Sequence, residues 1–402
     1  MSETAWLQCT ACSSRFEIGP LFYACPTCRA AGKTAPLEVA YDLAAMASPV
    51  GDDTTPGLWR WNHLLPPIDK SSRVSLGEAN TPLLPVTTGA GGLKVLLKNE
   101  TANPTWSWKD RPNCVSVSMA RAFNFTRTAA ISTGNHGCAA SAYSAAAAMK
   151  CTVFCHAGAP PAQLALMASY GARVVRGGDQ EGLFHQLLLR GGTYPCSIFC
   201  PRPGYANPFG IEGFKTIAFE IFEQLNHAVP DRVFVPTGSG DGIYGVWKGF
   251  RELRDLGLTA KAPRMIACQA SGADSVFRAF QRKSQHAEVL DSASTVALSI
   301  AERVTGDHAL RAVYQSGGSV ITCSDAEILD ASRVLRHQGL ALEPASAAAL
   351  ACAQKVASEK TAGETWVVIG SGSAVKWGNI AEGFEMPPIL PAGANLGDLS
   401  LD

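Results

Sequence analysis

Short, almost continuous apolar runs recur along this chain, each bounded by glycine or proline, and they limit what the chain can fold into. Examples are CTVFCHA, DRVFVPTG and TWVVIGSG. Strands that are covered on both faces have this pattern. Alanine-rich stretches of helical character lie between the runs, such as GCAASAYSAAAAM and EPASAAALACAQKVA. We therefore expect a two-lobed α/β fold with parallel or mixed sheets flanked by helices, and ligands at the carboxyl ends of the strands.

Composition and charge narrow the class of ligand. The 402 residues include 34 basic and 34 acidic side chains, so the formal net charge at pH 7 is zero. With no positive excess to attract nucleic acid or an anionic membrane, we expect neither as a partner. The N-terminus lacks the features of a signal peptide, and no apolar run approaches the roughly 18 residues of a membrane span. We expect a cytoplasmic protein that acts on a small molecule.

Four of the 13 cysteines form a pattern of their own. Cys9 and Cys12, followed by Cys25 and Cys28, make two C-x2-C knuckles in a short, turn-rich segment. Each knuckle offers two thiolates, so the pair can complete a tetrahedral zinc site. We expect a structural zinc ribbon here; cysteines that bind no metal are the alternative. The other cysteines lie in apolar or alanine-rich runs, as small buried side chains do.

Lys109 lies in the stretch NPTWSWKDRPNC, between two tryptophans and an aspartate–arginine pair. Aromatic neighbours that keep a lysine from water lower its pKa, and the neutral amine can then attack a carbonyl to form a Schiff base. The alternative is a surface lysine ahead of a helix, because Pro112 suits an early helical position. This stretch alone does not decide between the two.

A second candidate site lies where an apolar run meets the alanine-rich helix. Ser132, Thr133, Gly134 and Asn135 end the run, and His136 follows. Free backbone N–H groups and the positive end of a helix converge at such a point, where a carboxylate can bind. In the alternative interpretation, the hydroxyls are only N-caps and His136 is a hydrogen-bonded loop histidine.

A third candidate is a glycine-rich turn between an apolar run and a helix, made of Thr237, Gly238, Ser239, Gly240, Asp241 and Gly242. Its backbone amides could cradle a phosphate. The turn also matches the G-x-G-x-x-G pattern of dinucleotide sites, but the next predicted strand ends near Gln269, where an acidic residue would hold a ribose. Asp241 would also repel a pyrophosphate, so a phosphate monoester is the better ligand.

A fourth candidate is the turn in VVIGSGSAVKWG, where Ser371 or Ser373 could offer a hydroxyl to a ring nitrogen. By itself this is only a turn. Together, a reactive lysine, an anion-binding helix start, a phosphate cradle and a serine turn match the needs of pyridoxal 5'-phosphate. That cofactor carries an aldehyde, a phosphate, a phenolic oxygen and a pyridine nitrogen, and its amino-acid substrate brings a carboxylate.

The motifs resemble the tryptophan-synthase-β-like, fold type II group of pyridoxal-phosphate enzymes, and the threonine synthases most of all. LGEANTPL is similar to L-G-E-G-N-T-P-L, NPTWSWKDR to N-P-T-G-S-F-K-D-R, and NPFGIEGFKT to N-P-Y-R-I-E-G-Q-K-T. STGNHG and GSGSAVK have counterparts in the same order, and so does the ribbon. The resemblance implies a zinc-ribbon-like segment over 1–35, an arm and part of the large domain over 36–110, a small domain over 111–205, the rest of the large domain over 206–402, and a homodimer.

The resemblance also implies roles for individual residues. Lys109 would hold the cofactor and later move substrate protons. Asn135 would hydrogen-bond the phenolic oxygen, and the turn over 237–242 would hold the phosphate. Residues 132–136 would grip the substrate carboxylate.

Several positions depart from the family pattern. Gly210 stands where threonine synthases have an arginine expected to read the phosphate of O-phosphohomoserine, and a glycine offers no charged fork. Ile369 stands where a threonine usually faces the pyridine nitrogen, so Ser371 would take over that contact. Trp106 and Trp108 replace glycine and phenylalanine, which should narrow the pocket.

These departures keep two reactions open. One is the threonine synthase reaction on O-phosphohomoserine. The other is β-elimination or β-replacement on a small amino acid, of the serine or threonine dehydratase, diaminopropionate ammonia-lyase or cysteate synthase type. A catalytically silent relative that binds cofactor or a partner is the non-enzyme alternative.

Overall fold

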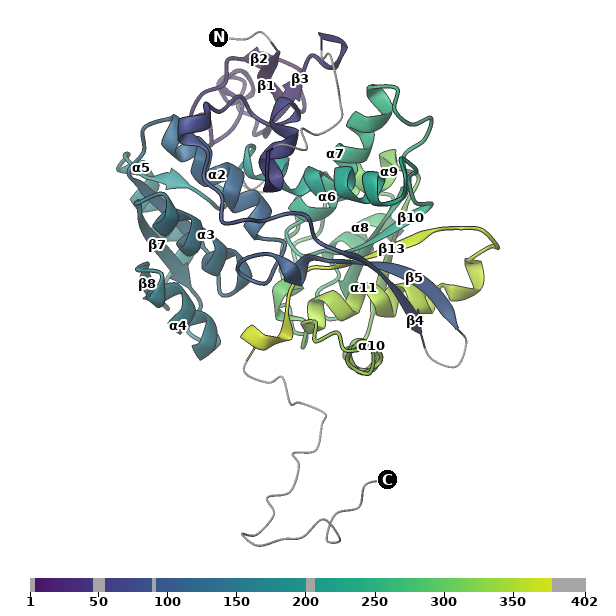
Figure 1. Cartoon of the computed structure of the whole chain (residues 1–402). Coiled ribbons are helices and arrows are strands. Elements are labelled where there is room, and N and C mark those ends of the chain that lie inside the picture. Colours follow the sequence, from purple (N-terminus) through teal and green to yellow (C-terminus); the bar gives the residue numbers. More distant parts are fainter. Residues whose placement is uncertain (1–3, 46–54, 89–91, 200–206, 378–402) are drawn as a thin grey trace, which may run out of the picture.

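The computed structural model describes residues 4–45, 55–88, 92–199 and 207–377 (Figure 1). It has the expected α/β architecture, with two helix-flanked sheets and a small N-terminal sheet. Every helix in the described ranges is too short or too polar to span a bilayer. The division of the chain at residues 35, 110 and 205 stays a prediction.

The larger sheet has six strands in the order β12-β11-β10-β13-β5-β4. All neighbours are parallel except β4 and β5, which form an antiparallel pair at one edge. The strands are β4 (Leu83–Thr88), β5 (Leu93–Asn99), β10 (Arg232–Pro236), β11 (Arg264–Ala270), β12 (Ser319–Cys323) and β13 (Trp366–Gly370).

Both faces of this sheet are buried, which explains its continuous apolar runs. Val233 and Val235 of β10 belong to one hydrophobic core, whereas Phe234 between them belongs to another. The first core includes helices α6 (Gly210–Gln224), α7 (Asp241–Asp255) and α9 (His308–Gln315), and the second includes α10 (Asp325–Arg336) and α11 (Pro344–Lys355). Helix α8 (Ser275–Gln281) lies beside β11 and β12.

The smaller sheet has four parallel strands in the order β8-β7-β6-β9. They are β6 (Arg127–Ile131), β7 (Lys150–Cys155), β8 (Arg173–Arg176) and β9 (Tyr194–Pro195). Its helices are α2 (Asp110–Ala122), α3 (Asn135–Ala146), α4 (Pro161–Ser169) and α5 (Gln180–Leu189). Helix α2 begins at Asp110, so Pro112 lies in its first turn, as expected of an early helical position. The Asp110 carboxylate accepts hydrogen bonds from the N–H and hydroxyl of Thr105.

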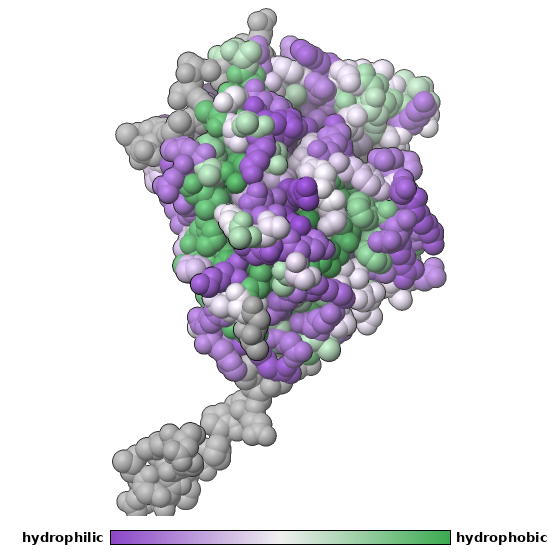
Figure 2. All heavy atoms as spheres, turned by 90° about the vertical axis from the view of Figure 1, so that its right-hand side faces the viewer, coloured by the Kyte–Doolittle hydropathy of each residue, from purple (hydrophilic) through white to green (hydrophobic). Residues whose placement is uncertain are grey.

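The N-terminal segment forms an antiparallel sheet of β1 (Ala5–Cys9), β2 (Arg15–Phe16) and β3 (Leu37–Tyr41), with the short helix α1 (Pro26–Ala30). Figure 1 shows it at the top of the molecule. On the face in Figure 2, hydrophilic residues predominate and hydrophobic ones lie between them.

A buried ion-pair network fixes the loop that carries Lys109. The Arg111 guanidinium donates hydrogen bonds to the carboxylates of Glu100 and Glu220 at 2.6–2.9 Å. Lys98 Nζ lies 2.6 Å from Glu220 Oε2, and all four side chains are at most 3% exposed. Strand β5 and helices α2 and α6 are thereby joined at one point.

Candidate functional site

The structure brings the four predicted loops together at the carboxyl ends of the two sheets. Lys109 directly precedes α2. Its loop is bonded to the serine turn, because Trp108 N–H donates to Ser371 O (2.9 Å) and Ser373 N–H donates to Trp106 O (3.0 Å). A Cβ added to Gly372 of that turn would lie 2.9 Å from Asn135 Nδ2, so the start of α3 adjoins it.

Lys109 has the aromatic surroundings that the sequence predicts. Its Nζ lies 5.3 Å from the ring centroid of Phe214 and 6.0 Å from that of Trp108. Burial lowers the pKa of the Lys109 ammonium, although the carboxylates of Asp241, Glu302 and Glu343 partly oppose this shift. A lysine in this state loses its proton more readily than one in water, as a nucleophilic amine requires.

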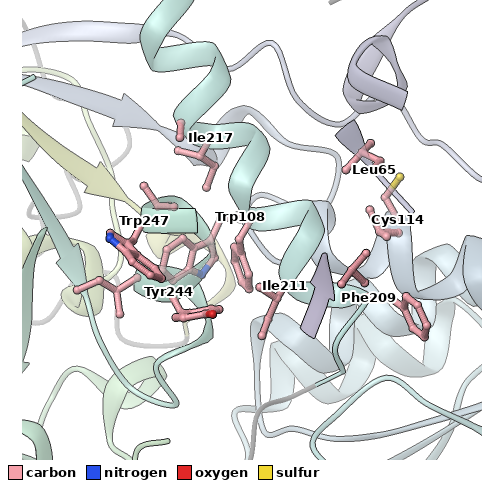
Figure 3. Close-up of a cluster of buried hydrophobic side chains, with 14 of the residues drawn as sticks. Leu65, Trp108, Cys114, Phe209, Ile211, Ile217, Tyr244 and Trp247 are labelled. Atoms are coloured by element: carbon pink, nitrogen blue, oxygen red, sulfur yellow. The ribbon is translucent and has the colours of Figure 1, made fainter. Parts of the chain in front are cut away.

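Trp108 forms a wall between the lysine loop and the glycine-rich loop. Its indole is 7% exposed and lies among side chains of α6 and α7, including Ile211 and Tyr244 (Figure 3). Trp106, in contrast, is 44% exposed and has a φ of +59°, a backbone conformation that favours glycine. Of the two tryptophans predicted to narrow the pocket, only Trp108 is buried, so the prediction now applies to Trp108.

The glycine-rich loop connects β10 to α7. Gly240, with a φ of +98°, is the N-cap of α7, and Asp241 is its first residue. Among the described residues, no acceptor receives a hydrogen bond from the backbone N–H of Gly238, Ser239 or Gly240. These amides and the start of a 15-residue helix form a cradle for an anion.

Residues 305–308, which follow α8, contact the glycine-rich loop. Thr305 Oγ1 donates to Gly238 O (2.7 Å), and Gly306 N–H donates to Ser239 O (2.9 Å). The Asp241 carboxylate accepts from Ser239 Oγ (3.0 Å) and lies 3.0 Å from His308 Nε2. The loop is therefore fixed by hydrogen bonds that do not use the backbone N–H groups of Gly238, Ser239 and Gly240.

Residues 132–136 join β6 to α3, as predicted. Ser132 Oγ accepts from Gly134 N–H (3.2 Å), and Asn135 begins the helix. Thr133 N–H has no acceptor among the described residues. The first-turn amides of α3 therefore point to a carboxylate site.

Burial keeps His136 neutral, and its hydrogen bonds indicate which ring nitrogen carries the hydrogen. The Asn113 amide nitrogen, which can only donate, lies 3.1 Å from His136 Nδ1, so Nδ1 accepts. Ser197 Oγ donates to Ile131 O and lies 3.0 Å from His136 Nε2, so Nε2 carries the hydrogen. Burial and the nearby Lys109 charge lower the pKa of His136 to about 3.

The sequence interpretation missed Glu343, which lies at the centre of the site. Its Oε2 accepts hydrogen bonds from Asn135 Nδ2 (2.8 Å), Ser299 Oγ (3.0 Å) and Trp377 Nε1 (2.6 Å). Ser371 Oγ donates to Oε1 (3.2 Å). This 1% exposed carboxylate thus connects two residues predicted to contact opposite parts of the cofactor ring.

The serine turn places Ser371 and Ser373 differently. Ser371 is 2% exposed, and its hydroxyl faces Glu343 and Ser346. Ser373 caps a short helix by accepting from Val375 N–H. Ile369 lies in the hydrophobic core and offers no polar group. Because Ser373 is used as a helix cap, Ser371 is the better candidate for a contact with the pyridine nitrogen.

Gly210 is the first residue of α6 and is enclosed by other side chains. A Cβ at this position would lie 2.9 Å from Ser116 Oγ and 3.7 Å from Pro112 Cβ. A larger side chain introduced here would first have to displace the buried Ser116 hydroxyl of α2. A simple gain of phosphate affinity from Gly210→Arg is therefore not expected.

Several buried polar atoms of the four loops have no hydrogen-bond partner in the protein. Among the described residues, Ser107 Oγ, Asn113 Oδ1 and Asn135 Oδ1 have no hydrogen-bond partner. Buried polar atoms are usually paired, so unpaired ones mark a place for ligand or water. With a buried lysine and a free amide cradle, these residues fit a phosphorylated carbonyl cofactor.

The chain belongs to the pyridoxal-phosphate-dependent enzyme family, because the model of that family matches residues 74–372. Within this family the chain is threonine-synthase-like. It is 35% identical to the threonine synthase of Methanocaldococcus jannaschii over 363 residues, which cover 88% of this chain and 87% of the relative. It is 33% identical to that of Methanosarcina acetivorans, with 92% of each chain covered.

Solved structures agree on the fold. The processed form of threonine deaminase isoform 2 from Solanum lycopersicum superposes with a TM-score of 0.62 at 21% identity, covering 73% of this chain and 79% of that chain. Maize serine racemase superposes with a TM-score of 0.63 at 20% identity, covering 76% and 91%. The predicted fold class, family and cofactor are confirmed.

Proposed function

We propose that this enzyme converts O-phosphohomoserine and water to threonine and phosphate. The observation that carries the proposal is the similarity to threonine synthases over almost the whole chain, at 33–35% identity. Convergence of the predicted loops on Lys109 supports it, because the chemistry requires a reactive amine, a phosphate cradle and a carboxylate site together.

The proposed roles follow the geometry. Lys109 joins the cofactor covalently, and the amides of residues 238–242 hold its phosphate, with Thr237, Ser239 and Asp241 shaping that loop. Asn135 would hydrogen-bond the phenolic oxygen, and Ser371 would supply the hydroxyl for the pyridine nitrogen. The substrate carboxylate binds at Ser132, Thr133, Gly134, Asn135 and His136. When bound, pyridoxal phosphate serves as the electron sink for a carbanion.

The chain's own residues then move protons and exclude water. Lys109 Nζ would take one proton from the substrate α-carbon and one from the β-carbon, and would return one proton to the γ-carbon and one to the α-carbon. The C–O bond at the γ-carbon breaks to release phosphate, and the oxygen of water bonds to the β-carbon while the remaining proton of that water passes to solvent. Trp108 and Phe214 shield the amine, and His136, being neutral, adds no charge beside it.

One observation favours the second reaction class. Gly210 offers no charged group to the substrate phosphate, and a Cβ at this position would lie 2.9 Å from Ser116 Oγ. A small amino acid without a phosphate would need no such group. β-Elimination or β-replacement of the serine or threonine dehydratase, diaminopropionate ammonia-lyase or cysteate synthase type is therefore the alternative.

An assay on the purified, cofactor-loaded enzyme distinguishes the two. Phosphate and threonine are measured with O-phosphohomoserine, and 2-oxo acid with serine, threonine and diaminopropionate. The proposal expects efficient release of phosphate and threonine in equal amounts. Release of 2-oxo acid without threonine formation would favour the alternative, and loss of both activities in Lys109→Ala is the control.

We also propose a structural zinc ion on Cys9, Cys12, Cys25 and Cys28. Their sulfur atoms all lie within 4.8 Å of one another, with Cys9–Cys28 at 3.7 Å and Cys12–Cys25 at 3.8 Å. Tetrahedral coordination with Zn–S bonds of ~2.3 Å requires sulfur separations of ~3.8 Å. One zinc per chain by elemental analysis, lost in Cys25→Ser/Cys28→Ser, is the expected result; a metal-free wild type would contradict it.

We further propose a cytoplasmic homodimer. The described cysteines are free thiols, as a reducing compartment requires. Light scattering on the purified enzyme should give twice the chain mass of 42.3 kDa, and a monomer mass would contradict the dimer.

A further inference from the structure

Strand β3 connects the ribbon sheet to the helices behind the glycine-rich loop. Tyr244 of α7 donates a short hydrogen bond from its hydroxyl to Glu38 Oε2. On the same strand, Lys248 Nζ donates to Val39 O (2.6 Å), and the Tyr41 hydroxyl donates to Glu212 Oε2 of α6 (2.6 Å). A buried carboxylate that accepts from a tyrosine forms a charge-assisted bond. The ribbon sheet is therefore anchored to α6 and α7 by buried polar contacts.

Among the contacts of the described residues, the one between Glu38 and Tyr244 continues to the proposed phosphate site. The ring of Tyr244 meets that of His308 edge to face, with centroids 5.5 Å apart and an angle of 82°. His308 lies beside the Asp241 carboxylate, with Nε2 3.0 Å from Oδ1. It also packs on Gly240, since a Cβ there would lie 3.2 Å from His308 Nε2. The chain Glu38–Tyr244–His308–Asp241 thus runs from β3 to the loop.

The same path leads back to the cysteine cluster. Strand β1 pairs with β3 so that Gln8 is opposite Glu38 and Cys9 is opposite Leu37. Glu38 is 8% exposed and Tyr244 is fully buried, so neither can exchange its partner for water at low cost.

We propose that Glu38, Tyr244 and His308 are positioning residues for the phosphate of the cofactor, and that through them the ribbon sheet sets the geometry of the glycine-rich loop. The inference rests on the proposed role of that loop as the phosphate site. Groups that hold binding residues in place affect affinity without touching the ligand. If the Tyr244 hydroxyl is removed, we expect the Tyr244 ring to be held less firmly. The His308 imidazole that packs on that ring would then also move more, and so would Asp241 and Gly240, which His308 contacts.

Tyr41 provides a matched control. Its hydroxyl also donates to a buried glutamate between β3 and a helix, although the Tyr41 side chain is partly buried, and its partner Glu212 binds Lys215 and Lys248 and not the loop. Tyr41→Phe and Tyr244→Phe each remove one hydroxyl. Both should lower stability, and only the second should change the site.

The experiment measures the pyridoxal phosphate dissociation constant of the full chain by fluorescence titration, and the 31P resonance of the bound cofactor. For Tyr244→Phe we expect about tenfold weaker binding, from loss of one charge-assisted bond, and a shifted resonance. Glu38→Ala should behave alike, whereas Glu38→Gln, which keeps an acceptor, should stay near the wild type. Tyr41→Phe should change neither quantity.

Wild-type values for both Tyr244→Phe and Glu38→Ala, or equal weakening by Tyr41→Phe, would overturn the inference while leaving the proposed function intact. If Tyr244→Phe does not fold, the comparison of Glu38→Ala with Glu38→Gln decides. A wild type that binds no cofactor would overturn the proposed function and the inference with it.

Discussion

The indole of Trp108 closes over Gly242: a Cβ on that glycine would lie 2.3 Å from Cη2 of the tryptophan and 2.7 Å from Cζ3. The residue before the proposed catalytic lysine therefore packs directly on the first turn of α7, where the phosphate is proposed to bind. Figure 3 shows Trp108 beside Tyr244, which also belongs to α7. The lysine loop and the glycine-rich loop are thus in direct contact through Trp108 and Gly242.

Gly242→Ala should destabilise the enzyme by about 1–3 kcal/mol and weaken cofactor binding, because the added methyl group overlaps a buried ring. Urea unfolding and fluorescence titration measure the two effects. Adding Trp108→Phe should restore part of both, since the smaller ring makes room. Gly19→Ala is the control, because its nearest neighbour would be 3.8 Å away. No recovery in the double variant would contradict the steric account.

Arg111→Met should lower the free energy of unfolding by roughly 3–5 kcal/mol. The substitution leaves the carboxylates of Glu100 and Glu220 buried with a single lysine, Lys98, for compensation. Arg254→Met, which removes a half-exposed ion pair with Asp255, should change stability by less than about 0.5 kcal/mol. Similar losses in the two variants would refute the importance of the buried network.

Replacing His136 by glutamine should remove part of the acid sensitivity of the fold. The pKa of His136 is about 3 in the folded protein, below its ordinary value of 6.5, so the unfolded chain binds a proton that the folded chain does not. The stabilisation is complete above pH ~6.5 and declines by about 1.4 kcal/mol per pH unit below it. Unfolding curves from pH 7.5 to 5 test this; a constant difference between wild type and His136→Gln would contradict it.

Glu343→Gln should cost about 1–3 kcal/mol of stability in the cofactor-free enzyme. An amide nitrogen would face the donors Asn135, Ser299 and Trp377, or leave Ser371 without its acceptor. Glu359→Gln is the control, because the Glu359 side chain is 54% exposed in its ion pair with Arg232. Equal stability of the two variants would show that Glu343 is not an essential acceptor.

The parts of the fold that depend on local pattern were predictable from the sequence. The runs around Val233 and Val367 became strands because both faces of the sheet are buried, and apolar residues satisfy both. The motifs indicated which loops carry Lys109, Asn135 and Ser371, and these loops lie together because the ends of parallel strands gather at one edge of a sheet; the roles of the three residues stay predictions.

What depends on tertiary contacts was not predictable. In the sequence, Glu343 is simply the residue before the proline that begins a helix. Its neighbours in the sequence do not indicate that Asn135 and Trp377 donate hydrogen bonds to it. Glu38 likewise gains its partner Tyr244 from a contact 206 residues away. The only signal for Glu343 in the sequence was its position as the acidic residue that opens the helical stretch EPASAAALACAQKVA.

The identity of the amine that binds the cofactor tests the account most directly. The holoenzyme is reduced with borohydride, digested, and searched by mass spectrometry for the pyridoxyl-modified lysine. Lys376 is the informative competitor, since burial also lowers the pKa of its ammonium, which donates to Thr105 O at 2.5 Å. We predict modification at Lys109 alone; a pyridoxyl group on Lys376, or on no lysine, would contradict the account.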